Sequence, residues 1–327
     1  MSRRIVVTGG AGFIGGSIVR QLATRGDHVV ALVRDPARAQ ATGLAGPNVE
    51  LVASDLSDPT TIATALSRAD GLIHGAGSYK VGIASSERAA MWDANVGTTE
   101  RVLAAARLAG TPRIAYVSTV GIFGDTHGRE VDETYRRDLA DGFLSTYDET
   151  KFRAHEVAEA AIADGLPVVI AQPGQVYGPG DHSQIGEILG DAYRGTLRYL
   201  ALGEVALEFA HVDDTAAGII AALDTGRVGQ AYVVAGEPST LEAAATLAAR
   251  LGGHARRRIT VPTGLLRAIA PLNDRLGGLP GMPANLHETI VAAQASFLAS
   301  HDKAARELAF SPRSLEQGIV DTFGVHS

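Results

Sequence analysis

Two side chains capable of proton transfer stand four positions apart near the middle of the sequence. Tyr147 and Lys151 fall one turn apart in a helix predicted over residues 147–164, so both point the same way. A free phenol has a pKa near about 10 and releases its proton reluctantly at neutral pH. Because a nearby cation favours the phenolate, we expect Lys151 to lower the pKa of Tyr147. The pair predicts a general acid for a reduction and a general base for the reverse reaction.

Two hydroxyl side chains precede this pair at the end of a predicted strand, residues 114–118. Ser118 and Thr119 are adjacent, and alternation along a strand points them to opposite faces. A hydroxyl beside the phenol can hydrogen-bond a substrate oxygen while negative charge develops on it. Either residue could complete a catalytic set with Tyr147 and Lys151.

A glycine-rich turn lies between a predicted strand, residues 4–8, and a helix that begins at Phe13 and Ile14. Gly9 and Gly12 carry no Cβ that would block a sharp turn or the approach of a pyrophosphate to the backbone. Gly15 lets the helix pack closely on the strand, and the helix N-terminus faces the phosphates. Strand, turn and helix together predict a dinucleotide-binding site.

Strand-like and helical segments alternate through the first half of the chain. Strands are predicted at residues 29–33, 49–53, 72–74, 114–118 and 168–171, with helices near 58–67, 89–109 and 147–164. This alternation predicts an α/β fold, a Rossmann doubly wound parallel sheet with a smaller, interleaved C-terminal substrate lobe. We assign residues 1–173 and about 211–235 to the dinucleotide-binding domain, and residues 174–210 and 236–327 to the smaller lobe.

Composition is typical of a cytoplasmic enzyme. A chain of 327 residues, 46% hydrophobic, can bury one large core and a smaller lobe. A net charge of -7 gives no footprint for nucleic acid or an anionic membrane, and Arg256-Arg257-Arg258 is a short basic run, typical of a solvated surface. The absence of cysteine excludes thiolate sites, and the ten histidines show no metal spacing.

The opening Thr8 and its Gly-x-x-Gly-x-x-Gly spacing resemble the extended short-chain dehydrogenase/reductase family. Further motifs follow in that family's order over nearly the whole chain. They are Asp55-Leu56, His74-Gly75-Ala76-Gly77, Asn95-Val96-Gly97-Thr98, Val117-Ser118-Thr119, Tyr147 to Lys151, Val176-Tyr177-Gly178-Pro179-Gly180 and His211-Val212-Asp213-Asp214. Val33-Arg34-Asp35-Pro36 and the tail from Ser300 to Arg313 look most like the dihydroflavonol-4-reductase-like group of this NAD(P)-dependent epimerase/dehydratase-like family.

The resemblance implies roles for individual residues. Counting back from Ile122-Phe123-Gly124, the family's catalytic hydroxyl falls on Thr119, with Ser118 second. Lys151 would also bind the nicotinamide ribose. Asn95 either holds a helix kink or a water for proton relay, or is structural. Asp55 would contact the adenine amine or cap a helix, and His74 is packed at a strand end. The implied cofactor contacts are Gly9, Gly12, Phe13, Ile14, Gly15, Asp55, Leu56, Gly75, Ala76, Gly77, Tyr147, Lys151, Pro173, Gly174 and Val176.

The end of the second strand predicts which dinucleotide binds. NAD enzymes place an acid there for the ribose 2′-hydroxyl, whereas a 2′-phosphate needs a cation. Alignment by eye places Val33 at the acidic position, with Arg34 next and Arg38 one turn later. Asp35 falls later, beside Pro36, where a helix-cap role is expected. We therefore predict NADP(H). The alternative is that both arginines are solvated surface charges.

Three functions fit these residues. The first is an NADPH-dependent carbonyl reductase that makes an alcohol from a ketone or aldehyde. The second is a nucleotide-sugar epimerase or dehydratase with bound NAD(P), although Gln172 stands where the family usually has Arg before Pro-Gly. The third is a non-catalytic NADP-sensing protein, which would not need the catalytic set.

The sequence also predicts the surroundings of the substrate and the assembly. Each substrate-wall residue could equally serve packing. The expected walls are Tyr79, Lys80, Phe143, Leu144, Gln175 and Tyr177. A homodimer is expected through helices 89–109 and 147–164, where small side chains would permit close packing or would face the sheet. These are Ala104, Ala105, Ala158 and Ala161.

Overall fold

A seven-stranded parallel sheet forms the centre of the computed structural model, which describes residues 2–254, 258–280 and 282–324. Its order is β3-β2-β1-β4-β5-β6-β10, with every neighbouring pair parallel. The strands are β1 Arg4–Thr8, β2 His28–Val33, β3 Val49–Ala53, β4 Gly71–His74, β5 Ile114–Val117, β6 Val168–Pro173 and β10 Ala231–Val234. This confirms the predicted Rossmann fold. The strand order reverses between β1 and β4, which places a ligand crevice at their carboxyl ends.

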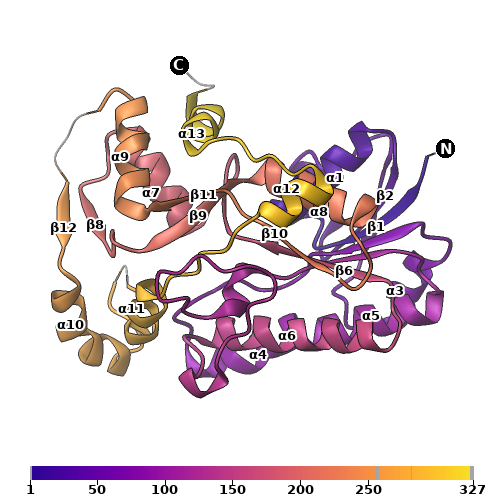
Figure 1. The fold of residues 1–327 in the computed structure, drawn as a ribbon, viewed down its shortest axis with the longest axis horizontal. Coiled ribbons are helices and arrows are strands. Elements are labelled where there is room, and N and C mark those ends of the chain that lie inside the picture. Colours follow the sequence, from indigo (N-terminus) through magenta and orange to yellow (C-terminus); the bar gives the residue numbers. More distant parts are fainter. Residues whose placement is uncertain (1, 255–257, 281, 325–327) are drawn as a thin grey trace.

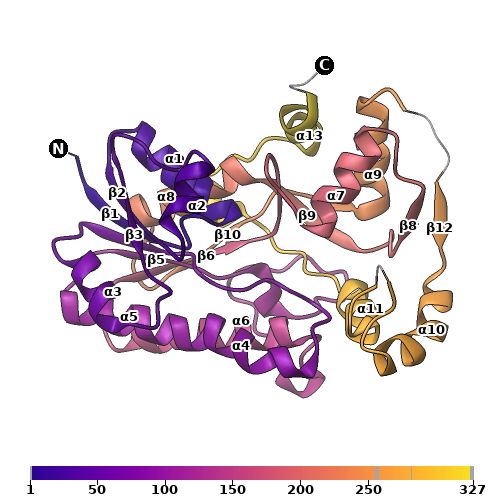
Figure 2. The same ribbon diagram turned by 180° about the vertical axis from the view of Figure 1, so that it is seen from behind.

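Helices cover both faces of this sheet (Figures 1 and 2). On one face lie α1 Phe13–Thr24, α8 Val212–Thr225 and α12 Asp302–Leu308, and on the other lie α3 Pro59–Leu66, α5 Thr98–Ala109 and α6 Thr146–Ala163. The short helices α2 Pro36–Ala41 and α4 Arg88–Trp92 lie in the connections after β2 and β4. Both faces of the sheet are therefore covered, as its continuous apolar strands require.

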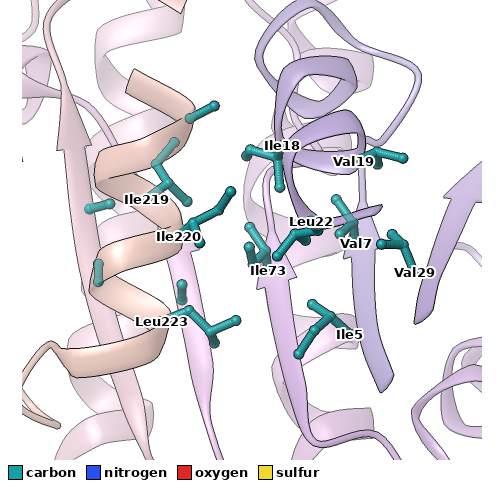
Figure 3. Packing of buried hydrophobic residues seen from close by; sticks show 14 of the residues in the cluster. Ile5, Val7, Ile18, Val19, Leu22, Val29, Ile73, Ile219, Ile220 and Leu223 are labelled. Atoms are coloured by element: carbon teal, nitrogen blue, oxygen red, sulfur yellow. The ribbon is translucent and has the colours of Figure 1, made fainter. Parts of the chain in front are cut away.

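The core between the sheet and the α1–α8 layer is built from alternating strand residues (Figure 3). Ile5 and Val7 of β1 are fully buried in one cluster with Leu22 of α1 and Ile219 of α8. Val6 points to the opposite face and joins the cluster beneath α3 and α5. The two-residue period of a strand thus anchors both helical layers to the strand that carries the glycine-rich turn.

A second lobe follows the carboxyl end of β6. It contains a sheet of β7 Gln175–Tyr177, β9 Ala206–His211 and β11 Glu237–Thr240, and a pair of β8 Tyr199–Ala201 with β12 Ile259–Val261. Its helices are α7 Gln184–Tyr193, α9 Leu241–Leu251, α10 Thr263–Arg275, α11 Leu286–Gln294 and α13 Leu315–Phe323. Between its segments, α8 and β10 return to the first domain, where α8 packs beside α1 and β10 pairs with β6.

The structure differs from two sequence-based boundaries. The helix predicted over residues 89–109 is interrupted by a π-helical turn, Asp93–Gly97, between α4 and α5. Residues 236–327 do not all belong to the smaller lobe. Ala304 and Leu308 of α12 are buried in the core of the first domain, beside α8 and β10, because the amphipathic face of this short helix covers the edge of the sheet.

The alanines expected at a dimer interface do not share one surface. Ala105 and Ala158 are buried in the cluster under the sheet, whereas Ala104 is exposed and Ala161 is half-buried. The structure therefore contradicts the interface role of Ala105 and Ala158, because their side chains face the sheet and allow α5 and α6 to pack closely on the strands. The homodimer itself stays a prediction.

One buried carboxyl group gives the fold a pH dependence that can be measured. Glu208 of β9 is buried, its Oε1 accepts the N–H of Ala299 at 2.7 Å, and its Oε2 has no partner among the described residues. Burial raises the pKa of Glu208 to about 8, from an ordinary value of 4.5. Between pH 4.5 and about 8 the carboxyl group is ionised in the unfolded chain and protonated in the folded chain. The contribution of Glu208 to the free energy of unfolding therefore falls as pH rises through this range.

We expect Glu208→Gln to increase the free energy of unfolding more at pH 8 than at pH 5, by on the order of 1–3 kcal/mol, because the amide keeps the acceptor and never ionises. Urea denaturation at both pH values measures this. Glu242→Gln, at an exposed position on α9, is the control and should show no such difference. An effect of Glu208→Gln that is the same at both pH values would contradict the assignment.

Candidate active site

The glycine-rich turn between β1 and α1 leaves room for a dinucleotide. Gly9 has φ of 72°, and a Cβ there would lie 2.8 Å from the backbone nitrogen of Ala76. A Cβ at Gly15 would collide with the carbonyl oxygen of Gly9, so the helix packs against the turn. Helix α1 begins after Gly12 without a capping side chain, which leaves its first amides for an anion. The residues present therefore fit a pyrophosphate.

The end of β2 offers cations and no carboxylate. Val33 is buried, and Arg34 and Arg38 are exposed with no hydrogen bond or ion pair from either guanidinium to any residue of the described ranges. Asp35 accepts the N–H of Arg38 at 3.0 Å and caps α2, which confirms its predicted cap role. The preference between NADP and NAD stays a prediction.

After β3, Asp55 is exposed and its carboxylate accepts from the hydroxyl and the N–H of Ser57, at 2.6 and 2.9 Å. These hydrogen bonds, the hydroxyl's first, hold the pKa of Asp55 below its usual value. The helix-cap alternative for Asp55 is wrong, because Asp58 caps α3. Leu56 is buried, and its carbonyl accepts from the guanidinium of Arg101 at 2.9 Å.

His74, at the end of β4, is a packing residue, as predicted. It is fully buried, with Nδ1 2.7 Å from the Thr8 hydroxyl and Nε2 3.2 Å from the Thr99 hydroxyl. Burial, to which the charge of Lys151 adds, lowers the pKa of His74 to about 3, so the ring is neutral. The following Gly75-Ala76-Gly77 brings bare backbone to the crevice beside the glycine-rich turn.

Thr119 and Tyr147 meet at the carboxyl end of β5, and Ser118 does not join them. The Ser118 hydroxyl is buried 2.9 Å from Nδ1 of His155, on the opposite side of the strand. Thr119 is half-buried, its hydroxyl accepts the N–H of Gly121 at 3.1 Å, and the same hydroxyl lies close enough to Tyr147 to affect the pKa of the phenol. Strand alternation has separated the two hydroxyls, so Thr119 is the catalytic candidate and the alternative role for Ser118 is wrong.

The phenol of Tyr147 is protonated at neutral pH. Burial raises its pKa, the neighbouring Tyr79 adds to that rise, and the hydrogen bond with Thr119 opposes it. The expected lowering of this pKa by Lys151 is not found, because burial and the neighbouring Tyr79 raise it and Lys151 makes no resolved contribution. A protonated phenol is the form that a general acid requires.

Lys151 lies one turn further along α6. Its ammonium donates to the carbonyl of Val117 at 3.1 Å and lies 5.5 Å from the ring centroid of Tyr116. Burial lowers the pKa of Lys151 to about 8, so the group is mainly charged at neutral pH. The contact with Val117 holds the cation under the end of β5, on the side of α6 that carries Tyr147.

Asn95 is a structural residue here. It lies in the π-helical turn, where Oδ1 accepts the N–H of Ser78 at 2.7 Å and Nδ2 donates to the Thr150 hydroxyl at 2.9 Å. Its amide therefore ties the loop after β4 to α6. These contacts fit the structural role and the predicted role in holding a helix kink, and the part in proton relay stays a prediction.

The predicted substrate walls divide into two groups. Tyr79 is 63% exposed and its ring lies edge-on to that of Tyr147, with centroids 4.8 Å apart. The structure contradicts the wall role of Tyr177, which is buried in the core of the second lobe and donates to the Leu315 carbonyl at 3.4 Å. Lys80 pairs with Glu87 at 2.7 Å.

The remaining wall candidates are half-buried. The ring centroids of Phe143 and Phe152 lie 5.6 Å apart, and the Arg137 guanidinium lies 4.7 Å from the centroid of Phe143. Leu144 donates its N–H to Asp148, and the side chain of Gln175 donates to the Val176 carbonyl. Their role at a substrate stays a prediction. The cofactor candidates Pro173, Gly174 and Val176 lie at the end of β6, directly after it and in β7, respectively. A Cβ at Gly174 would meet the carbonyl of Glu208 at 2.8 Å.

Three contacts that shape the site escaped the sequence analysis. The buried pair Arg137–Asp148, 2.7 Å apart, fixes the loop that leads into α6. His155 holds Ser118, and its spacing of four from Lys151 was a signal that could have found it. Glu288 of α11 accepts the N–H groups of Gly82 and Thr146, at 3.4 and 3.3 Å. Sequence gave no signal for Glu288, because both partners are far away along the chain.

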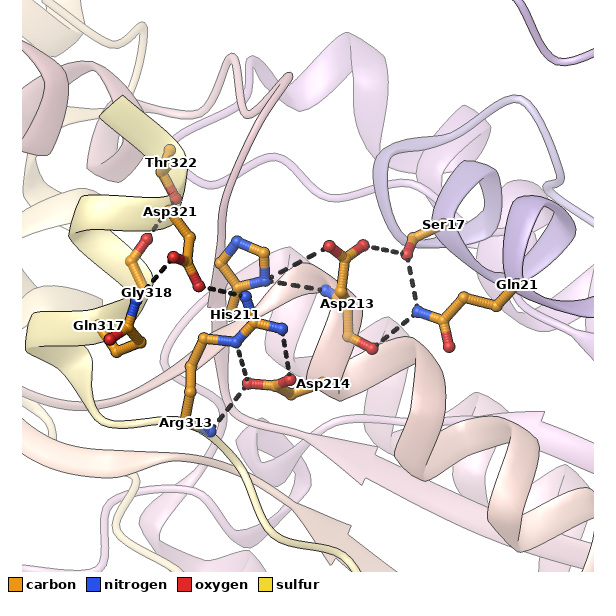
Figure 4. A network of polar contacts seen from close by, with 10 residues as sticks. All are labelled: Ser17, Gln21, His211, Asp213, Asp214, Arg313, Gln317, Gly318, Asp321 and Thr322. Carbon is orange, nitrogen blue, oxygen red and sulfur yellow. Dashed lines mark hydrogen bonds and ion pairs between the residues drawn. The ribbon is translucent and has the colours of Figure 1, made fainter. Parts of the chain in front are cut away.

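A polar network joins the dinucleotide-binding helix to the second lobe (Figure 4). Ser17 of α1 donates to Asp213 at 2.6 Å, and His211 caps α8 by accepting the N–H of Asp213. Arg313 then bridges Asp214, at 2.9 Å, and Asp321 of α13, at 2.7 Å. This confirms that residues 211–214 end a strand and cap a helix, and it fixes α8 between both lobes.

The fold and site define a Rossmann protein of the short-chain dehydrogenase/reductase type, with a glycine-rich turn that fits a dinucleotide. The model of the NAD dependent epimerase/dehydratase family matches residues 5–235, and the chain belongs to this family.

Curated relatives include reductases. "Sterol demethylase protein B" of Methylococcus capsulatus is 32% identical over 83% of this chain and 81% of its own. A Synechocystis protein named provisionally as a dihydroflavonol 4-reductase is 29% identical over 96% and 92%. The 4-hydroxy-2-methyl-3-oxo-4-farnesyl-3,4-dihydroquinoline-1-oxide ketoreductase of Stigmatella aurantiaca is 28% identical over 97% and 95%. The chain thus spans nearly the whole length of these proteins.

Solved structures share the complete fold. Gox2253 superposes with a TM-score of 0.84 at 29% identity, over 99% of this chain and 97% of that one. A dTDP-glucose 4,6-dehydratase double mutant from Streptomyces venezuelae, with NAD bound, has a TM-score of 0.78 at 25% identity, over 98% and 96%.

Proposed function

We propose that this protein is an NADPH-dependent reductase that converts a ketone or aldehyde into an alcohol. The observation that carries the proposal is the protonated phenol of Tyr147, held between the Thr119 hydroxyl and the ring of Tyr79. The bound cofactor would supply a hydride to the carbonyl carbon. Tyr147 donates its proton to the carbonyl oxygen, and Thr119 hydrogen-bonds that oxygen as charge develops on it. Lys151 contributes a positive charge beneath both.

An apolar ketone is the substrate class that we propose. The names of two relatives refer to a sterol and to a farnesyl-bearing ring ketone. Tyr79, exposed beside Tyr147, offers an aromatic surface, and Phe143 and Gln175 remain the proposed side walls. Gln172, near the end of β6, stands where the family usually has an arginine before Pro-Gly, which weakens the case for a phosphorylated sugar.

The test is a panel of ketones and aldehydes assayed for NADPH oxidation, with uridine and thymidine diphosphate sugars alongside. Oxidation driven by ketones, with formation of the alcohol, supports the proposal. Conversion of a diphosphate sugar without net NADPH consumption would instead establish an epimerase or dehydratase. That second candidate is favoured by the family model and by the dehydratase among the structural neighbours. NADPH binding with no turnover of either class would leave the sensing function.

We predict that NADPH binds well over tenfold more tightly than NADH, because the free guanidinium of Arg34 can pair with the 2′-phosphate and Val33 offers no acceptor to a 2′-hydroxyl. Arg34→Ala should narrow the difference by roughly 1.5–3 kcal/mol, the scale of a charged hydrogen bond. Titration calorimetry with both cofactors measures it. Arg20→Ala is the matched control, because it removes an exposed arginine that lies on α1, away from the end of β2. Equal affinities in the unmodified protein would overturn the assignment.

A further inference from the structure

Helix α10 carries an apolar stripe on the face that it turns away from the protein. Leu265, Leu272 and Leu276, which directly follows the helix, are 56%, 57% and 60% exposed. Spacings of seven and four place them on one side of the helix. The adjacent side, including Leu266, Ile269 and Ala270, packs against α11. The stripe therefore extends the apolar surface of α10 beyond the part that the fold buries.

The apolar surface extends onto the strand pair that precedes α10. Ile259 of β12 and Tyr199 of β8 are register partners, so their side chains lie next to each other, and both are exposed. Strand β12 leads directly into α10 through Pro262. Both views show β8, β12 and α10 along one outer edge of the second lobe (Figures 1 and 2).

The charges around this edge are positive, although the whole chain has a net charge of -7. Arg267 and Arg275 are exposed on α10, and Arg198 and Arg258 precede the two strands. The carboxylate of Asp274 on α10 accepts hydrogen bonds from the N–H groups of Leu286 and His287.

A second carboxylate, Glu204, reaches the start of α10 and accepts the hydroxyl of Thr263. Arg256 and Arg257 lie outside the described residues. The Arg267 guanidinium donates to Gln294 of α11 and the Arg258 guanidinium to the Ala245 carbonyl of α9, so both charges stay at this edge with no carboxylate partner among the described residues. The stripe is thus an apolar surface bordered by cations.

The edge is connected through α11 to two segments of the candidate active site. Helix α11, which α10 covers, contacts the loop after Tyr79 through Asn285, whose N–H donates to Gly82 at 3.0 Å. Glu288 of the same helix accepts from Gly82 and from Thr146, the residue before Tyr147. A surface that receives α10 would therefore be linked through α11 to the segments that carry Tyr79 and Tyr147.

We propose that α10 and the strand pair β8–β12 dock on an anionic lipid bilayer, with the leucines in the interface and the arginines at the headgroups. An apolar helical face bordered by arginines has the features of a helix that lies in the plane of a membrane surface. None of the helices in the described ranges is long and apolar enough to cross a membrane. The overall charge predicted no such affinity because a sum over the chain hides a local cationic edge. Docking serves the proposed function by bringing the site to apolar ketones dissolved in the bilayer.

The test is sedimentation of the full-length protein with vesicles of phosphatidylcholine alone or with phosphatidylglycerol added. We expect binding to the anionic vesicles and weak binding to the neutral ones. Leu272→Ser with Leu276→Ser should lower the partition coefficient by about tenfold for each leucine lost. Arg267→Gln with Arg275→Gln should lower it by about fivefold for each charge, and only on anionic vesicles. Leu108→Ser, on α5 and 84% exposed, is the matched control and should bind as the unmodified protein does.

Equal sedimentation of the unmodified protein and the double leucine variant would overturn the proposal. A second copy of the chain could cover the stripe instead of a membrane, and light scattering without lipid tests this alternative. If the unmodified protein is a dimer and only the leucine variant is a monomer, the stripe is a dimer interface. Vesicle binding needs neither substrate nor cofactor, so the docking proposal can be supported even if the protein reduces no ketone. Reduction of a water-soluble ketone should be unchanged in the leucine variant, which keeps the two proposals separately testable.

Discussion

A Tyr147→Phe variant is expected to reduce carbonyl substrates roughly 10²–10⁴-fold more slowly than the unmodified protein, the range for lost general acid catalysis. The substitution removes one hydroxyl and keeps the ring, so the edge-on packing against Tyr79 should survive. NADPH affinity, measured by calorimetry, should therefore stay unchanged while kcat falls. Steady-state kinetics at saturating NADPH with the best ketone of the panel provide the measurement.

The matched control is Tyr135→Phe, which removes a half-buried phenol that packs against Phe123 outside the site. Thr119→Ala should lower kcat less than Tyr147→Phe does. Ser118 cannot replace the lost hydroxyl, because it is bound to His155 on the other side of the strand. Near-full turnover by Tyr147→Phe would show that the proton comes from another group.

The sequence predicted the Rossmann sheet and the main catalytic candidates because their signals are local. Glycine spacing, buried strands and the four-residue spacing of Tyr147 and Lys151 are properties of short segments. Strand alternation was enough to separate Thr119 from Ser118, and the structure adds His155 as the reason why Ser118 is unavailable.

The errors came from contacts between segments that are distant in sequence. Tyr177 looked like a wall residue beside the site, but it packs with Phe209 and under α13, and a Cβ at Gly318 would collide with its hydroxyl. Likewise, Glu288 reaches the catalytic helix from a position 142 residues beyond Thr146. Local patterns do not encode such pairings, and long-range packing decides which face of a segment is buried.

The pKa of Tyr147 illustrates how burial can reverse an argument based on spacing. The sequence placed a cation beside the phenol, which favours ionisation. The fold also removes the phenol from water and places Tyr79 against it, and these effects raise the pKa instead. In the proposed reaction the cation keeps a role, because it would stabilise the phenolate that forms once the proton has been given to the substrate.

A Lys151→Met variant is expected to lose at least as much activity as Tyr147→Phe, roughly 10²–10⁴-fold, because it removes the charge that stabilises the phenolate. Burial lowers the pKa of Lys151 to about 8, so the group is charged below that pH and neutral above it. In the unmodified protein, kcat/KM for reduction should therefore be constant below about pH 7 and fall as pH rises through about 8. Lys151→Met should lack this alkaline decrease, because it has no proton to lose there. If the decrease persisted in Lys151→Met, another group would set the pH dependence, and the role given to Lys151 would be wrong.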